Sequence, residues 1–270
     1  MTQLKHYEIV VIGAGPGGYA AAFRAADLGK RVLLIDRDNE LGGVCLNRGC
    51  IPSKALLHIS KVMSEAEHLS KMGVTYSKPA IDIDQVRAHI NKIVSQLNGG
   101  IAQMAKARKV DTIQGLAAFK SNSELNIETE DGHISISFDK CIIAAGSTSA
   151  MIPGVPNDHP SILTSKTALD LVDIPEKLLV IGGGIIGLEL GQVYAALGSR
   201  VSVVEFLPTL LPGTDPDLVK PLQRKLKNQF ESILVSSKVI SVETNEDETL
   251  TVAIENDKGI TRERFNKVLV

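Results

Sequence analysis

One pattern occurs twice in this chain of 270 residues and limits what it can fold into. In each copy an apolar segment leads into a glycine-rich turn, then a helical segment, then a second apolar segment that ends in an acidic residue. The copies span residues 9–36 and 178–205, about 170 residues apart. This order predicts strand, turn, helix and strand, the unit from which parallel α/β sheets are built.

The first turn carries three glycines, each with a distinct expected role. Gly13 permits the tight turn, Gly15 lets the backbone approach a pyrophosphate, and Gly18 lets the helix pack closely on the strand. The helix N-terminus then offers unpaired N–H groups to an anion. Asp36, 18 residues after Gly18, is placed to accept hydrogen bonds from ribose hydroxyls. These spacings predict a dinucleotide site.

The second turn repeats the arrangement with Gly182, Gly184 and Gly187, and Glu205 again follows the third glycine by 18 residues. A carboxylate suits a free ribose 2′-hydroxyl and repels a 2′-phosphate, so this site is expected to prefer NAD over NADP. We therefore predict an α/β fold of two Rossmann-like three-layer domains, 1–150 and 151–270, the second incomplete at its C-terminus.

Two cysteines, Cys45 and Cys50, lie five positions apart just before a predicted helix that starts at Ser53. A regular helix holds such a pair too far apart for an easy disulfide, so the chain must be distorted between them. A helix N-terminus favours thiolate over thiol, which predicts a reactive pair. A metal site is disfavoured because further ligands with suitable spacing are missing. Cys141, in the apolar segment 141–145, is expected to be an inert residue of a buried strand.

Composition excludes several classes of function. Lys+Arg 29 against Asp+Glu 31 gives a formal net charge of -2, which leaves no basic excess for a nucleic-acid backbone. The longest apolar stretches are interrupted by glycine and fall short of a membrane span. The N-terminus lacks the pattern of a secretory signal, so we expect no membrane association and a cytoplasmic protein. In that compartment a disulfide is expected to be catalytic rather than structural.

The region between the copies is predicted to contain two helices, from Ser53 to about Leu69 and from about Ile83 to Lys106. Glycine's entropy cost predicts a weak point in the second at 98–100. The alternating segments 125–129 and 134–138 predict a β-hairpin around Gly132. After the second copy, a helix from about Asp217 to Phe230 and several strands are expected. The chain stops on an apolar strand, 267–270, which we expect to expose an associating edge.

These features resemble those of the FAD-dependent pyridine nucleotide-disulfide oxidoreductases. The segments GGVCLNRGCIPSK and GGGIIGLELG are most similar to members that oxidise dihydrolipoamide. The resemblance implies FAD in the first fold, NAD in the second, and electrons passing from dihydrolipoamide through a redox-active disulfide and FAD to NAD. It implies that Cys45 exchanges with lipoamide and that Cys50 lies against the flavin as the charge-transfer thiolate.

The resemblance also implies further cofactor contacts and partners. The partners are lipoamide-bearing domains of 2-oxoacid dehydrogenase complexes and, in the complete enzyme, a second copy in a homodimer. The implied contact residues are Lys54 and Glu189 near the flavin and nicotinamide, Gly115 and Ala117 on the adenosine side of FAD, Ala145, Gly146 and Ser147 closing the FAD domain, and Val239 near the NAD adenine.

The chain also departs from the usual sequence of the family. Asp36, Val44 and Arg48 stand where glutamate, threonine and valine are common, and Arg48 is a candidate to shift the thiol pKa or the choice of substrate. None of the six histidines matches the family's acid/base histidine, so we expect an N-terminal portion with little turnover and weakened FAD binding. Two alternatives stay open: a reductase of glutathione, mercuric ion or another disulfide, and a non-catalytic nucleotide-binding or assembly module.

Overall fold

The structure, a computed structural model, describes residues 4–150 and 152–270. Its internal contacts divide the chain into two compact units, treated separately below. Unit 1 comprises the residues up to Pro52 together with Asn91–Thr148, and unit 2 comprises Ser53–Ile90 together with Ser149–Val270. The limits 1–150 and 151–270 remain a prediction about independently folding domains.

Unit 1 is built on a six-stranded sheet of order β3-β2-β1-β6-β5-β4. The first four of these strands are parallel, and β5 and β4 continue the sheet in antiparallel pairing. The β5–β6 pair confirms the predicted hairpin around Gly132. The strands are β1 (Lys5–Ile12), β2 (Val32–Asp36), β3 (Asp111–Gln114), β4 (Leu116–Ser121), β5 (Glu124–Thr129) and β6 (Gly132–Ile143).

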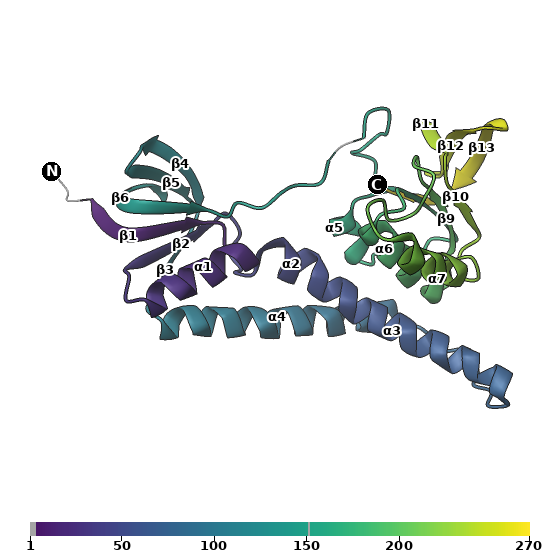
Figure 1. Cartoon of the computed structure of the whole chain (residues 1–270), viewed down its shortest axis with the longest axis horizontal. Helices are drawn as coiled ribbons and strands as arrows, with labels where there is room; N and C mark the ends of the chain where they lie inside the picture. Colours follow the sequence, from purple (N-terminus) through teal and green to yellow (C-terminus); the bar gives the residue numbers. More distant parts are fainter. Residues whose placement is uncertain (1–3, 151) are drawn as a thin grey trace. The chain divides into compact units, whose positions relative to one another are not determined.

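Alternation along β1 and β2 places side chains on both faces of this sheet. Val11 and Leu34 pack with residues of the helices, whereas Val10 and Leu33 pack with residues of β5 and β6. Figure 1 shows α1 and α4 on one side of β1–β3. Both faces are therefore covered, as the near-continuous apolar runs predict.

The helices of unit 1 follow the glycine turn and the dithiol motif. They are α1 (Pro16–Asp27), the short α2 (Gly43–Arg48), the start of α3 (Cys50–Leu69) and most of α4 (Ile83–Ala107). Helix α3 starts three residues earlier than predicted, because Pro52 falls in a first turn whose N–H groups need no partner. Helix α4 is uninterrupted at Gly99-Gly100, where a weak point was expected, because Val94, Ile101 and Ala105 bury its apolar face.

The expectation that residues 141–145 form a buried strand is only partly correct. Cys141 to Ile143 do pair with β1 as the C-terminal part of β6. However, Cys141 is only partly buried, and the exposed fractions of Ile142 and Ile143 are 37% and 68%. Burial still raises the pKa of the Cys141 thiol, which disfavours its thiolate.

Unit 2 contains a five-stranded parallel sheet of order β10-β9-β8-β14-β7 and a separate three-stranded antiparallel sheet of order β11-β12-β13. The parallel strands are β7 (Ile162–Leu163), β8 (Lys177–Ile181), β9 (Arg200–Val204), β10 (Ser232–Leu234) and β14 (Lys267–Leu269). The antiparallel strands are β11 (Lys238–Thr244), β12 (Leu250–Asn256) and β13 (Gly259–Phe265). The helices are α5 (Ser165–Leu169), α6 (Ile185–Leu197) and α7 (Pro216–Leu226), and η1 (Ser70–Met72) follows α3.

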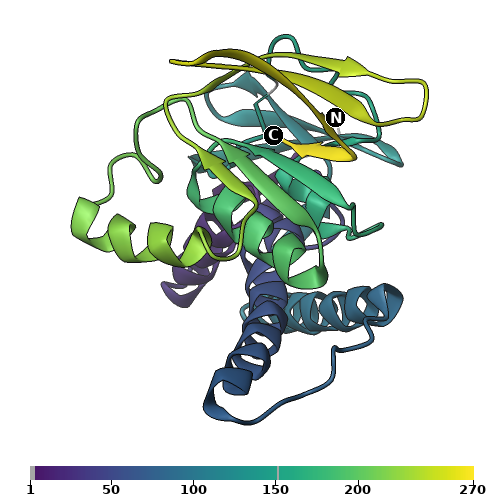
Figure 2. The same ribbon diagram turned by 90° about the vertical axis from the view of Figure 1, so that its right-hand side faces the viewer.

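The parallel sheet of unit 2 is the middle of three layers. Leu178 and Val180 of β8 pack with residues of α5, α6 and α7, whereas Leu179 packs with residues of β11–β13. Figure 2 shows these helices and the antiparallel sheet on opposite sides of the parallel strands. Strand β14 pairs with both β8 and β7, so it lies inside the sheet and is not the exposed edge that was expected.

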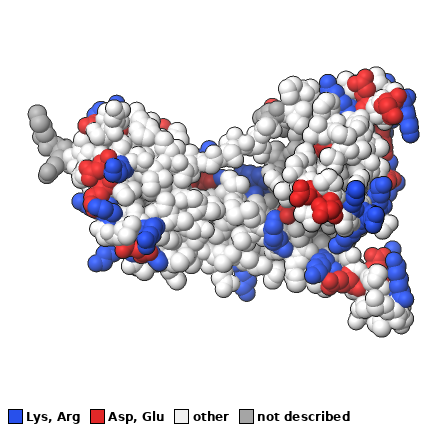
Figure 3. Space-filling view, viewed as in Figure 1, with Lys and Arg blue, Asp and Glu red and all other residues white. Residues whose placement is uncertain are grey.

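Two general properties complete the description. On the face drawn in Figure 3, basic and acidic side chains of the described residues are interspersed. Among residues 4–150 and 152–270, no helix is long and apolar enough to cross a membrane.

Candidate functional site

The first glycine turn is packed so tightly that two of its glycines admit no side chain. Gly13 has φ +98°, and its N–H donates to the Ile35 carbonyl at 2.7 Å. A Cβ on Gly13 would lie 2.2 Å from the Ala144 carbonyl oxygen, and one on Gly18 would lie 1.6 Å from the Gly13 carbonyl oxygen. The turn thus holds β1, β2, β6 and α1 together through backbone atoms.

Helix α1 begins directly after this turn with an open N-terminus. Its N-cap residue Gly15 makes no side-chain capping hydrogen bond, and its first turn contains no acidic residue. A Cβ on Gly17 would meet nothing within 4 Å. The first turn therefore presents N–H groups and the positive end of the helix dipole to any anion placed before it.

Asp36 ends β2 beside the turn, and its carboxylate is held by the backbone. Its Oδ2 accepts from the Ala14 N–H at 2.5 Å and its Oδ1 from the Asp38 N–H at 2.9 Å. Each carboxylate oxygen has a second lone pair, so these bonds leave capacity for a ribose hydroxyl.

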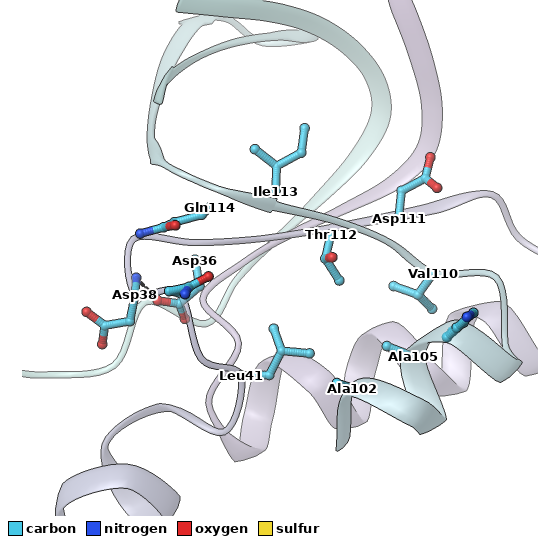
Figure 4. Close-up of a pocket in the computed structure, with 12 residues that line it drawn as sticks. Asp36, Asp38, Leu41, Ala102, Ala105, Val110, Asp111, Thr112, Ile113 and Gln114 are labelled. Atoms are coloured by element: carbon cyan, nitrogen blue, oxygen red, sulfur yellow. Dashed lines mark hydrogen bonds between the residues drawn. The ribbon is translucent and has the colours of Figure 1, made fainter. Parts of the chain in front are cut away.

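A pocket of about 580 Å³ opens next to Asp36. Figure 4 shows Asp36, Asp38 and Gln114 at one end of it, the α4 residues Ala102 and Ala105 below, and Thr112 and Ile113 of β3 above. The volume falls in the range of small-molecule sites, roughly 300–1,000 Å³. Its lining mixes the carboxylates Asp36, Asp38 and Asp111 with apolar side chains of α4 and β3.

The dithiol segment packs against the first glycine turn. The Gly42 N–H donates to the Ala14 carbonyl at 2.9 Å. Gly43 has φ +60°, and a Cβ on it would lie 2.5 Å from the Gly15 Cα. The backbone at the start of α2 therefore touches the backbone of the turn, which fixes where the helix that carries Cys45 begins.

The distortion expected between the two cysteines is present at Gly49, which separates α2 from α3. A Cβ on Gly49 would lie 2.8 Å from the Val44 carbonyl oxygen and 3.4 Å from the Cys45 Cα. The junction thus closes tightly over the residue that bears the first thiol. Cys45 is partly buried and Cys50 is exposed, the reverse of what the resemblance implies for a thiol that exchanges with lipoamide and a thiol that lies against the flavin.

The second glycine turn, in unit 2, has the same backbone but a different environment. Gly182 has φ +109° and donates to the Val204 carbonyl at 2.8 Å, which repeats the Gly13 arrangement. Cβ atoms on Gly182 and Gly184 would meet nothing within 4 Å. A Cβ on Gly187, by contrast, would lie 2.7 Å from the Gly182 carbonyl oxygen. The N-terminus of α6 again lacks a side-chain cap and acidic residues in its first turn.

Glu205 repeats the role of Asp36 at the second turn and is more deeply buried, with 8% exposed. Its Oε2 accepts from the Gly183 N–H at 2.6 Å, and its Oε1 accepts from the Leu207 N–H at 2.7 Å. The carboxylate is therefore fixed at the end of β9 with its negative charge beside the open part of the turn.

Lys54 and Glu189 are also brought together within unit 2. The Lys54 ammonium contacts both carboxylate oxygens of Glu189, at 2.8 and 2.7 Å. The resemblance implied that these two side chains approach each other, and the structure joins them across 135 positions of sequence.

The remaining predicted residues lie on or near these elements. Gly115 follows β3 and donates its N–H to the Asp36 carbonyl at 2.7 Å. Ala117 pairs with Ile127 in the β4–β5 ladder, and Val239 is the second residue of β11. Residues 145–147 follow β6 and are exposed.

Sequence reasoning missed two features of the site. Gly43 stood in the quoted motif without a role, although a glycine pair before a short helix was a signal of close approach. Asp38 carried no signal, because no spacing rule pairs it with Arg48, the residue that it contacts ten positions along the chain.

The residues present fit the two nucleotides. Uncapped helix N-termini supply donors for diphosphate groups, and each strand-end carboxylate supplies acceptors for ribose. Positions 182 and 184 leave space where side chains would block a ligand. In the described part of the chain, His, Cys, Asp and Glu side chains form no group of three or more suited to a metal ion.

Comparison with known proteins gives the family directly. The sequence profile described as "Pyridine nucleotide-disulphide oxidoreductase" matches residues 7–268. A dihydrolipoyl dehydrogenase of Vibrio cholerae is 46% identical over 264 residues, which cover 97% of this chain and 55% of that protein. The mitochondrial dihydrolipoyl dehydrogenase 2 of Arabidopsis thaliana is 41% identical over 242 residues, 89% of this chain and 48% of that protein. The chain thus spans about half the length of the curated relatives it matches.

A solved structure supports the same assignment. The HOCl-induced flavoprotein disulfide reductase RclA from Escherichia coli, in a Cu(II) complex, superposes with a TM-score of 0.82 at 27% identity. The match covers 98% of this chain and 56% of that one. The two glycine turns, the cysteine pair and these relatives agree: the chain belongs to the pyridine nucleotide-disulphide oxidoreductase family and is a homologue of the dihydrolipoyl dehydrogenases.

Proposed function

We propose that this chain carries the redox dithiol and the nucleotide-binding portion of a dihydrolipoyl dehydrogenase. In this function, dihydrolipoamide is oxidised to lipoamide, the Cys45–Cys50 disulfide is reduced and reoxidised, and NAD is the final acceptor. The lipoamide would be carried by domains of 2-oxoacid dehydrogenase complexes, and the complete enzyme would act as a homodimer.

One observation carries the proposal: α2 rests backbone to backbone on the first nucleotide turn. The contact between Gly43 and Gly15, with the Gly42-to-Ala14 hydrogen bond, places Cys45 on a helix that starts at the turn. A dithiol fixed next to a dinucleotide site is what electron transfer to a bound redox nucleotide requires.

The exchange chemistry at the cysteines balances as follows. One thiolate of dihydrolipoamide attacks the Cys45 sulfur, which forms a mixed disulfide and releases Cys50 as a thiolate. The second substrate thiol, after losing its proton, attacks the substrate sulfur of the mixed disulfide. This step releases lipoamide and the Cys45 thiolate, so two electrons have moved to the cysteine pair.

The groups that would hold the two nucleotides lie in separate units. Asp36 and the N-terminus of α1 would hold FAD in unit 1, with its adenosine part in the pocket next to Asp36. Glu205 and the N-terminus of α6 would hold NAD in unit 2, where the buried carboxylate disfavours a 2′-phosphate. When bound, FAD would supply the two-electron redox chemistry that links the dithiol to NAD.

The test is the reductive half-reaction of the full chain loaded with FAD. Anaerobic dihydrolipoamide should bleach the flavin absorbance. The Cys45→Ser and Cys50→Ser variants should lose this bleaching but keep the bleaching by NADH, which does not pass through the cysteines. Cys141→Ser is the matched control and should behave like the unaltered chain.

Other outcomes would favour the alternatives. Bleaching by dihydrolipoamide in both cysteine variants would contradict a role for the dithiol. Equal reduction by NADPH and NADH would contradict NAD preference. A chain that retains no flavin at any FAD concentration but binds NADH would be a nucleotide-binding module.

A further inference from the structure

Arg48 is the last residue of α2, and its guanidinium forms an ion pair with Asp38. The two side chains are 24% and 31% exposed, so water screens this pair less than most of the ion pairs in the described residues. Because Asp38 neutralises the guanidinium, Arg48 acts through position rather than as an unpaired cation beside the thiols.

Asp38 belongs to the first nucleotide site. It lines the pocket together with Asp36, as Figure 4 shows. Its backbone N–H donates to Asp36 Oδ1, while Asp36 Oδ2 accepts from the Ala14 N–H of the glycine turn. A continuous series of polar contacts thus runs from the turn through both aspartates to the C-terminal end of α2, all within unit 1.

The same end of α2 has a second anchor. Asn98 Nδ2 of α4 donates to Asn47 Oδ1 at 2.7 Å and contacts Glu40 Oε2 at 3.3 Å. The Gly43 contact fixes the other end of the helix. Cys45 therefore lies between two fixed points, and the ion pair of Arg48 joins the C-terminal end of α2 to the loop after β2.

We propose that the Arg48–Asp38 ion pair is a positioning contact that couples the first nucleotide site to the Cys45–Cys50 pair. The inference rests on the proposed function, since it concerns the same dithiol. The proposal gives a role to Arg48, which stands where the family commonly has valine. In this role, Arg48 links nucleotide binding to disulfide closure.

The direction of the effect follows from geometry. A disulfide requires Cα atoms within about 7 Å, so closure is favoured when α2 is held in one place. Removing the ion pair lets α2 move and lowers the effective concentration of one thiol at the other. The disulfide should then become easier to reduce, by about 5-fold for a partly covered ion pair.

The experiment equilibrates the full chain with glutathione. Two glutathione thiols are oxidised to one glutathione disulfide as Cys45–Cys50 is reduced to two thiols, and mass spectrometry after alkylation gives the ratio. Arg48→Gln and Asp38→Asn should each shift the equilibrium about 5-fold towards the dithiol. The double variant should shift it no further, and Arg48→Lys should recover part of the loss. The matched control is Arg108→Gln, which breaks the similarly exposed Arg108–Asp27 pair of unit 1 and should shift nothing.

A second series repeats the measurement at saturating FAD. In the unaltered chain FAD should change the exchange constant, and by linkage the disulfide should change the affinity for FAD by the same factor. Arg48→Gln should reduce this factor towards one, whereas Arg108→Gln should retain it. Circular dichroism confirms that each variant is folded.

Each outcome decides a separate claim. An unaltered exchange constant in Arg48→Gln, additive effects in the double variant, or a FAD effect that persists in Arg48→Gln would overturn the coupling. The absence of a FAD effect in the unaltered chain would also overturn it. If Cys45 and Cys50 form no disulfide at any glutathione ratio, both the proposed function and the coupling fail, whereas failure to react with dihydrolipoamide contradicts the proposed function alone.

Discussion

The two glycine turns share one backbone and differ in what surrounds them. In both, the first glycine has positive φ and donates to the neighbouring strand, and a strand-end carboxylate accepts from the turn. In unit 1, however, Gly13 and Gly43 are pressed against other backbone atoms, whereas Gly182 and Gly184 of unit 2 face open space. The first turn therefore joins several elements through its backbone, whereas the second turn leaves its first and third positions, Gly182 and Gly184, open.

This difference separates two reasons for a glycine. Packing explains Gly18 and Gly187, and positive φ explains Gly13 and Gly182. At Gly184 φ is -80° and no neighbour is near, so neither reason applies within the chain. In the proposed NAD site a glycine here would let a bound ligand approach the backbone closely, which makes Gly184 the most direct test of the second site.

The largest effect is expected for Gly18→Ala. Its Cβ would lie 1.6 Å from the Gly13 carbonyl oxygen, and no flexible side chain can move to relieve this clash. We expect a loss of about 4 kcal/mol in the free energy of unfolding of unit 1. Denaturant unfolding followed by circular dichroism measures it, because the chain has no tryptophan. Gly17→Ala, with nothing within 4 Å, is the control; equal midpoints for both variants would refute the prediction.

Gly43→Ala should have the next largest effect, a loss of about 3 kcal/mol in the free energy of unfolding. The new Cβ would lie 2.5 Å from the Gly15 Cα, and the residue has φ +60°. Gly29→Ala is its control, because Gly29 has φ +79° but open space around it. That control isolates the conformational cost, about 1 kcal/mol. If both variants lose the same stability in the same unfolding assay, the contact between α2 and the first turn is not tight.

Gly187→Ala should destabilise unit 2 by about 2 kcal/mol. The new Cβ would lie 2.7 Å from the Gly182 carbonyl oxygen and 2.9 Å from Val180 Cγ1, and the methyl group can move away. Hydrogen exchange monitored by mass spectrometry should place the loss of protection in β8, β9 and α6. Loss confined to β1 and β2 would show that the effect has been assigned to the wrong unit.

The smallest effect on stability is expected for Gly184→Ala, about 1 kcal/mol, because alanine is a poorer N-cap than glycine but the new Cβ would meet nothing within 4 Å. Its effect on ligand binding should be the largest of the second turn, a loss of about tenfold in affinity for NADH. Calorimetric titration of the folded variant measures the affinity. Unchanged affinity would mean that the nucleotide does not approach this backbone.

Local sequence patterns predicted most of the helices, strands and turns, because these elements depend mainly on residues close together in the chain. Both strand, turn, helix and strand units, the hairpin around Gly132 and the helix 83–107 could be found from periodicity and turn residues. The apolar segment 141–145 was assigned too much burial, because exposure depends on which elements cover a strand and not on its own composition.

The sequence predicted the positions of the candidate site residues but not the contacts between them. Spacing located Asp36 and Glu205 at the strand ends beside their turns, where the structure has them. Spacing could not show that Gly43 touches Gly15 or that Arg48 meets Asp38, since these contacts join segments with no common period. The short helix α2 was also missed. Its six residues lie between Gly42 and Gly49, and so short a segment has little intrinsic preference for a helix.

The position of β14 has a consequence for how unit 2 is assembled during synthesis. Strand β7, near residue 162, finds its sheet partner in β14, whose residues 267–269 leave the ribosome more than a hundred residues later. Until then β8 lacks a neighbour on one side, and an apolar strand edge stays open to association with other chains. A nascent chain paused before this strand would therefore be a natural client for chaperones, whereas unit 1, with its sheet finished by residue 143, would already be closed.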